Sequence, residues 1–140
     1  MTRAVTIVVP GRPPNPNVAR RYHWRTRHRT DQAWKAVAAE AARRALPDGW
    51  EPLTKARMSV VHVVPTKARR DPDNLSAGIK ASLDGLVLGG VIADDSDRVL
   101  VSVSHTIEYV KGVTETRYTF EEAPSSPSDD RGGPEGEGGV

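Results

Sequence analysis

Strict alternation of apolar and polar side chains from Val99 to Tyr109 constrains the fold more than any other feature of the chain. One side of this segment carries Val99, Val101, Val103 and Ile107, and the other carries Ser102, Ser104, Thr106 and Glu108. A period of two predicts a strand with one wet face. The turn residues Lys111-Gly112 then predict a hairpin with a second strand over 113–120.

Other segments extend this pattern into an order of elements. Strands are predicted over 4–9, ended by Pro10-Gly11, and over the β-branched residues 57–64. Residues 12–29, rich in Pro, Asn and Arg, are predicted as a loop. Two helices are predicted. The first covers 31–45, with Thr30 or Asp31 as N-cap and a face of Trp34, Val37, Ala38, Ala41 and Ala45. The second covers 74–88, with Leu75, Ile79, Leu83, Leu86 and Val87 at helical spacing before Gly89-Gly90.

The resulting order, β-α-β-α-β-β, predicts an α/β (α+β) fold in which two helices pack on one small mixed sheet. The chain of 140 residues fits one domain, expected over 1–122. Residues 123–140 consist mostly of Gly, Pro, Ser and acids, so a disordered acidic tail is expected there. No internal repeat is found. The absence of cysteine excludes disulfides and thiolate sites, and no apolar stretch is long enough to cross a bilayer. We therefore expect a soluble protein of a reducing compartment, with no membrane partner.

Charge is distributed unevenly along the chain, although the net charge is only +2. Residues 1–70 contain 15 Lys and Arg against 4 Asp and Glu, whereas residues 71–122 contain 4 against 10. This polarity is typical of a protein that attracts a polyanion with one part and gathers acidic groups in another.

The acidic part begins with Asp71-Pro72-Asp73-Asn74, between a predicted strand and a predicted helix. Pro72 favours an extended backbone at Asp71, which places the carboxylates of Asp71 and Asp73 on one side. Two carboxylates this close repel each other unless a cation lies between them. Oxygen ligands of this kind suit Mg²⁺ or Mn²⁺. The alternative is a turn and helix N-cap, in which Asp73 accepts backbone N–H bonds.

Two further acidic features bear on this alternative. On a helical wheel Asp73, Lys80 and Asp84 share the face opposite the leucine stripe, although a solvated i,i+4 pair of Lys80 and Asp84 explains the same pattern. Asp94, Asp95 and Asp97 directly precede the strand from Val99, where an ordinary acidic turn is the alternative. This turn can approach Asp71 and Asp73 only through the packing of adjacent strands.

A basic segment precedes the first predicted helix. Residues 20–29 contain five arginines, two histidines and two aromatic residues. Arginine forks suit phosphate contacts, and Trp24 or Tyr22 can stack on an unpaired base. The alternative is a solvated loop in which Trp24 packs on the core. His62 and His105 lie within β-rich segments and are expected to be packing or surface residues rather than ligands.

Several familiar sites are absent from the sequence. It contains neither GxxxxGK[ST] nor GxGxxG, so no nucleotide cofactor is expected. The segment after Asp71 lacks the later ligands of an EF-hand loop, and no serine has a GxSxG setting.

Three segments together resemble the RusA family of Holliday-junction resolvases: Arg70-Asp71-Pro72-Asp73-Asn74-Leu75, Lys80-Ala81-Ser82-Leu83-Asp84-Gly85-Leu86 and Gly90-Val91-Ile92-Ala93-Asp94-Asp95. They are similar, in order, to the DxDN, K–xxLDxL and G–DD motifs of that family, and the resemblance covers roughly residues 4–120. The interval from DxDN to Lys80 is about one helical turn longer than in the family's best-known form.

The resemblance implies a homodimeric endonuclease that nicks four-way DNA junctions symmetrically with Mg²⁺ or Mn²⁺, in recombination and repair. It implies that Asp71, Asp73 and Asp95 bind the metal, with Asp94 as a further acid beside them, and that Lys80 is the catalytic lysine. Arg70 would contact DNA beside the site. From the basic composition we expect further phosphate contacts by Arg69, Arg20, Arg21, Arg25 and Arg27. The expected location is the cytoplasm of a bacterial or phage-infected cell.

Two other functions fit the same residues. A non-catalytic DNA-binding module would use the acids as helix caps and a surface turn, and its binding would be strongly salt-dependent. A nuclease acting on other branched DNA would keep the metal chemistry and change the substrate.

Overall fold

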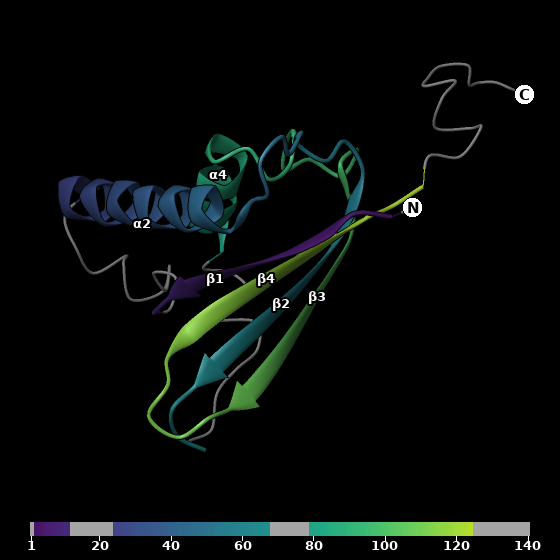
Figure 1. Cartoon of the computed structure of the whole chain (residues 1–140). Helices are drawn as coiled ribbons and strands as arrows, with labels where there is room; N and C mark the ends of the chain where they lie inside the picture. The colour runs from purple at the N-terminus through teal and green to yellow at the C-terminus, as the bar shows by residue number, and fades with distance from the viewer. Residues whose placement is uncertain (1, 12–23, 68–78, 125–140) are drawn as a thin grey trace, which may run out of the picture.

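A four-stranded mixed sheet carries two helices on one side (Figure 1). The computed structural model describes residues 2–11, 24–67 and 79–124, without the side chains of Trp24, Thr26 and Arg27. The elements follow the order β1 (Ala4–Pro10), α2 (Trp24–Ala45), β2 (Ala56–Val64), α4 (Lys80–Leu88), β3 (Leu100–Tyr109) and β4 (Glu115–Glu122). The predicted α+β fold and its order of elements are confirmed. No helix in the described ranges is both long and apolar enough to span a membrane.

The sheet has the strand order β1-β4-β2-β3, so the predicted hairpin between β3 and β4 is wrong. β3 pairs with β2 in parallel, and β4 pairs antiparallel with both β1 and β2. The reason lies in the side chains of β4: Tyr118 and Phe120 are the largest fully buried residues. A strand with such side chains buries more apolar surface as an inner strand, between β1 and β2, than as an edge strand. The turn at Lys111-Gly112 is present, with Gly112 at φ 74°.

The core lies between the helices and one face of the sheet. Rows of facing side chains cross β1, β4 and β2, including Ile7, Tyr118 and Val60, which are all fully buried. Alternation along each strand places polar residues such as Thr6 and Thr119 on the outer face, where their hydroxyls lie 2.9 Å apart. Packing therefore specifies the register in the strands next to the helices.

Helix α2 begins at Trp24, so the predicted loop end at residue 29 and the predicted N-cap at Thr30 or Asp31 are wrong. No glycine or proline occurs between Trp24 and Ala45, and arginine is a good helix former. The second half of the basic segment is therefore helical, and the predicted end at Ala45 is confirmed.

The buried face of α2 is also rotated from the predicted one. Ala38, Ala39 and Ala42 are buried, whereas Val37 and Ala45 are exposed. The cause is a close crossing with α4: a Cβ on Gly85 would lie 2.3 Å from the Lys35 carbonyl oxygen. Small residues on both helices permit this approach, which larger side chains such as Val37 would prevent.

Helix α4 begins at Lys80, with Ile79 as its N-cap residue, rather than at the predicted Asn74. Residues 74–78 lie outside the described ranges. The predicted end is confirmed, because Gly89 caps the helix and Gly90 follows with φ 89°. At the other end of the chain, Ala123 is buried and donates its backbone N–H to the Lys55 carbonyl, so packing against β2 extends just past β4. Nearly all of the expected tail lies outside the described residues.

Candidate functional site

The start of α4 lies close to the acidic turn that contains Asp94, Asp95 and Asp97. The chain between them first leads away along α4 and then reverses direction. Gly90 reverses the chain, and Val91 donates its N–H to the Leu86 carbonyl. The returning segment is fixed on Leu53, which donates to Val91 O and accepts from Ala93 N at 3.0 and 2.9 Å. Because Val91 and Ile92 are buried there, Asp94 and Asp95 emerge at a defined place beside α4.

Lys80 occupies the centre of this cluster. Its ammonium donates to Asp84 Oδ1 at 2.8 Å and to Asp95 Oδ2 at 2.7 Å. The bond to Asp84 is the i,i+4 pair that the helical wheel anticipates, and the bond to Asp95 joins two separate elements. These two carboxylates, Asp84 first, raise the pKa of Lys80 well above its usual value, so the lysine is fully charged at neutral pH.

The acidic turn is itself ordered by hydrogen bonds. Val99 and Leu100 donate their backbone N–H groups to the Ser96 carbonyl at 3.0 and 2.8 Å. The hydrogen bond from the Ser96 side chain, followed by the backbone N–H of Asp95, lowers the pKa of Asp94. Asp94 and Asp95 therefore offer negative charge close to one cation, with the Asp95 side chain 24% exposed and open to solvent.

Three sequence-predicted site residues lie in this cluster or beside it: Lys80, Asp94 and Asp95. The remaining acids and flanking basic residues lie outside the described ranges: Asp71, Asp73, Arg69, Arg70, Arg20 and Arg21. Arg25 lies in the first turn of α2 and is exposed to solvent. Arg27 lies two residues further along the helix, and its side chain is not described. Within the described ranges, no three acidic or histidine residues gather closely enough to hold a metal ion.

The described acids nevertheless fit a hard divalent cation in their chemistry. Asp84 and Asp95 approach one ammonium from two elements, so they already share a positive charge. Carboxylate oxygens, with neither sulfur nor imidazole beside them in the cluster, are the ligands that Mg²⁺ and Mn²⁺ prefer.

A histidine pair lies apart from this cluster, on neighbouring strands. His62 Nε2 and His105 Nδ1 are 3.0 Å apart, and the two rings are nearly parallel at 15° with centroids 5.3 Å apart. His62 is fully buried, and this burial, with the charge of His105 as the second cause, lowers its pKa to about 4. The expected packing role fits His62. The bond to His105 was not predicted, because it depends on β2 and β3 being adjacent.

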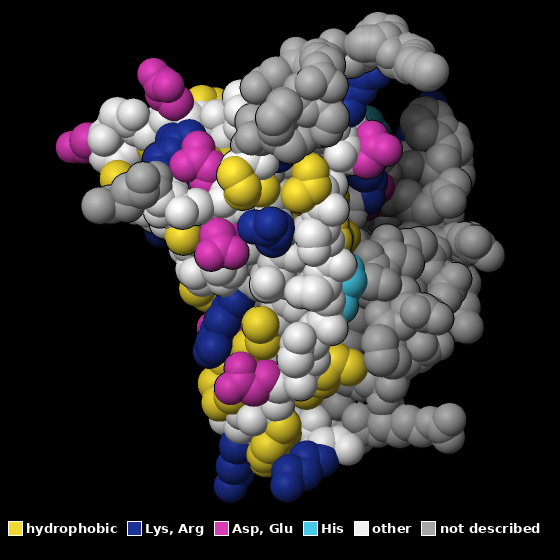
Figure 2. Space-filling view, turned by 90° about the vertical axis from the view of Figure 1, so that its right-hand side faces the viewer, with side chains coloured by type: hydrophobic (Ala, Val, Ile, Leu, Met, Phe, Trp, Pro, Cys, Tyr) yellow, Lys and Arg dark blue, Asp and Glu magenta, His cyan; other side chains and the backbone are white. Residues whose placement is uncertain are grey.

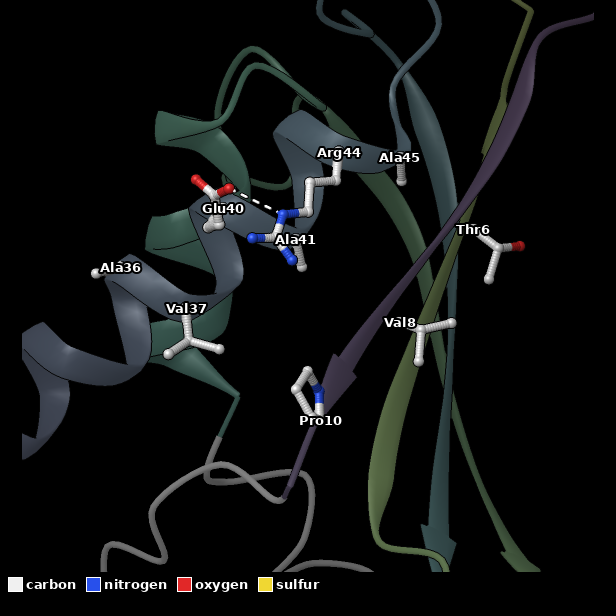
Figure 3. A pocket seen from close by; sticks show the side chains of 9 residues that line it. All are labelled: Thr6, Val8, Pro10, Ala36, Val37, Glu40, Ala41, Arg44 and Ala45. Carbon is white, nitrogen blue, oxygen red and sulfur yellow. Dashed lines mark hydrogen bonds and ion pairs between the residues drawn. The ribbon is translucent and has the colours of Figure 1, made fainter.

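A groove with a volume of about 620 Å³ lies between α2 and β1 (Figure 3). Its lining is mostly apolar, with the Glu40–Arg44 ion pair at 3.0 Å on the helix side. The lining residues are Thr6, Val8, Pro10, Ala36, Val37, Glu40, Ala41, Arg44 and Ala45. None of these belongs to α4 or to the acidic turn, so the groove and the Lys80 cluster are separate features.

Comparison with models of known protein families finds no match, and comparison with curated protein sequences finds none either. Among solved structures, the chain is distantly similar to cyanuric acid hydrolase, described as an evolutionary innovation by structural concatenation. The TM-score is 0.36 at 15% identity, over 87% of this chain and 38% of the hydrolase. This chain thus spans less than half the length of that structure.

Proposed function

We propose that this protein is a metal-dependent endonuclease that cuts four-way DNA junctions, as the resemblance to the RusA family implies. The observation that carries the proposal is the position of Lys80, bonded at once to Asp84 and to Asp95. A lysine beside carboxylates that can hold a metal is an arrangement suited to phosphodiester cleavage.

The described residues take distinct roles in this proposal. Asp95, with Asp94 beside it, holds the metal together with Asp71 and Asp73, which precede α4 in the sequence. A bound Mg²⁺ or Mn²⁺ would supply an activated water for in-line attack and stabilise charge on the leaving 3′ oxygen. Lys80 places its positive charge beside the scissile phosphate. Asp84 would hold the Lys80 ammonium if Asp95 served as a metal ligand.

The start of α2 supports DNA as the substrate. Its first turn contains no acidic residue, and Arg25, His28 and Arg29 are exposed there. Arginine side chains exposed at this end of the helix are suited to contacts with DNA phosphates. In a homodimer, a two-fold axis would match the two related scissile phosphates of a four-way junction.

The test is cleavage of a synthetic four-way junction and of linear duplex with the same sequence, each with Mg²⁺ and with EDTA. We expect paired nicks in the junction that require both the metal and Asp95. Asp95→Asn should abolish them, whereas Asp97→Asn, a change to an exposed residue of the same turn, should leave them. Tight binding without cutting in Mg²⁺ or Mn²⁺ would favour the DNA-binding module instead, and cutting of flaps or forks in preference to junctions would change the substrate.

A further inference from the structure

Strand β3 forms one edge of the sheet and leaves its outer side open. It pairs with β2 along its length, and no other strand of the described chain lies beside it. An open edge is a template for pairing with another strand, and proteins usually protect such edges with lysine, proline or a bulge. β3 contains no lysine and no proline, and its one irregularity lies at its start, where the register with β2 shifts between Leu100 and Ser102, so that the pairing is regular from Ser102 to Tyr109. Its single charged residue, Glu108, lies 3.5 Å from Arg117 of β4 across the sheet.

The same strand exposes an unusual amount of apolar surface. Val101 and Val103 are each 45% exposed, Ile107 is 37% exposed and Tyr109 is 42% exposed. Alternation along a strand places all four on one face, the face that carries the core in β2 and β4. The expectation of one wet face is therefore wrong for β3, where the apolar face is also open. Figure 2, which views the molecule from the β3 side, shows hydrophobic side chains at several places on this side, with basic and acidic side chains between them.

The sequence of β3 is also nearly symmetric about His105. Val101 and Tyr109 lie at equal distances from it, and so do Val103 and Ile107. On the other face, the neighbours of His105 are Ser104 and Thr106, which are both small and hydroxylated. When two copies pair antiparallel with His105 opposite itself, every exposed apolar residue of one copy faces an apolar residue of the other.

We propose that β3 pairs antiparallel with β3 of a second copy of this chain, about a two-fold axis at His105. Pairing of this kind satisfies the open backbone edge, brings the four apolar side chains of each copy into contact with those of the other, and joins two four-stranded sheets into one. A self-symmetric strand favours a second copy over an unrelated partner, because only a two-fold contact makes the same patch complementary to itself. The proposal rests on the homodimer of the proposed function and names its surface.

The test measures the mass of the full chain in solution, by light scattering during size-exclusion chromatography or by sedimentation. We expect the wild type to be a dimer, and V103K and I107D each to be monomers. The double variant V103K/I107D should be a dimer again, because the new lysine of each copy faces the new aspartate of the other. Within one copy these positions are about 13 Å apart, too far for an ion pair.

The matched control is V8K on β1, since Val8 is also 45% exposed but lies on the opposite edge strand. V8K should remain a dimer. A wild type that stays monomeric, or a dimer unaffected by V103K and I107D, overturns the proposal. If V103K and I107D are monomers and the double variant V103K/I107D does not form a dimer again, the axis does not lie at His105. Hydrogen exchange of the wild type needs no variant: those amides of 101–109 that point to the open edge should lose protection on dilution, whereas those that point to β2 should keep it, and unchanged protection of the first set contradicts the proposal.

These results are separable from the nuclease activity. A dimer that fails to cut junctions contradicts the proposed function and leaves the surface in place. Junction cutting by a dimer that is insensitive to the β3 variants supports the function and overturns the surface.

Discussion

The ammonium of Lys80 lies 2.7 Å from Asp95 Oδ2, although fifteen residues separate the two in the sequence. The chain between them forms α4, reverses at Gly90 and is held on Leu53 before it reaches the acidic turn. This contact joins two of the three segments that resemble the RusA motifs. Lys80 remains largely exposed, so the arrangement leaves the ammonium accessible to a ligand.

The first prediction concerns the separate effects of Lys80 on activity and stability. Lys80→Gln should lower the rate of junction cleavage by about 10²–10³-fold, because it removes a positive charge from the reacting phosphate. It should change the free energy of unfolding by less than about 1 kcal/mol, since ion pairs of exposed side chains contribute little. Single-turnover cleavage and urea denaturation measure the two effects.

Arg44→Gln is the matched control, because it removes an exposed i,i+4 ion pair from α2 at a distance from the cluster. The free energy of unfolding of Arg44→Gln should change as little as that of Lys80→Gln, and its cleavage rate should equal that of the wild type. A Lys80→Gln protein that cuts at the wild-type rate would remove Lys80 from the mechanism.

The second prediction concerns the crossing of α2 and α4. A Cβ on Gly85 would lie 2.3 Å from the Lys35 carbonyl oxygen and 2.8 Å from Ala38 Cβ. Gly85→Ala should therefore destabilise the fold by about 1–3 kcal/mol, because the helices must move apart. Denaturation in urea measures this loss.

Gly112→Ala separates helix crowding from backbone strain. Gly112 has φ 74°, and no atom lies within 4 Å of the position that a Cβ would take. Any loss of stability in Gly112→Ala therefore comes from the backbone conformation alone. A Gly85→Ala protein as stable as the wild type would show that the crossing can widen without cost.

The positions of the elements along the chain were predictable because they follow from local patterns. β-branched residues identified β2 and alternation identified β3, each to within a residue, and Gly89-Gly90 indicated the end of α4. The start of α2 was not predictable in the same way. Six arginine-rich residues from Trp24 form either a loop or a helix, and composition alone favours neither strongly.

The arrangement in space was less accessible from the sequence. A turn such as Lys111-Gly112 indicates a reversal, but the choice of neighbour for β4 depends on where Tyr118 and Phe120 are buried. The bond between Lys80 and Asp95 depends in turn on Leu53, a residue that carries no motif. Asp84 had a detectable signal, its i,i+4 spacing from Lys80, but the same spacing occurs on any solvated helix face.

A third prediction concerns the polar contact inside the α2–α4 interface. The Trp34 indole Nε1–H donates to Ser82 Oγ, and Ser82 is fully buried. Ser82→Ala should cost about 1–3 kcal/mol of unfolding free energy, because it leaves a partly buried donor without its acceptor. Urea denaturation followed by circular dichroism measures the cost. Ser59→Ala, on the exposed outer face of β2, should be nearly neutral, and equal effects of the two changes would contradict the role of this contact.

The last prediction is a dependence of stability on pH that arises from His62. Burial lowers the pKa of His62 from 6.5 to about 4, so the unfolded chain binds a proton between these pH values that the folded chain does not. The contribution of His62 to the free energy of unfolding should therefore be fully present above about pH 6.5. It should be lost as the pH decreases toward 4, and the total loss from this group should be about 3 kcal/mol. Urea denaturation at a series of pH values measures the slope. His62→Gln should flatten the curve in this window while leaving the acidic limb below pH 4, which carboxylates cause. A variant with the wild-type slope would assign the pH dependence to other groups.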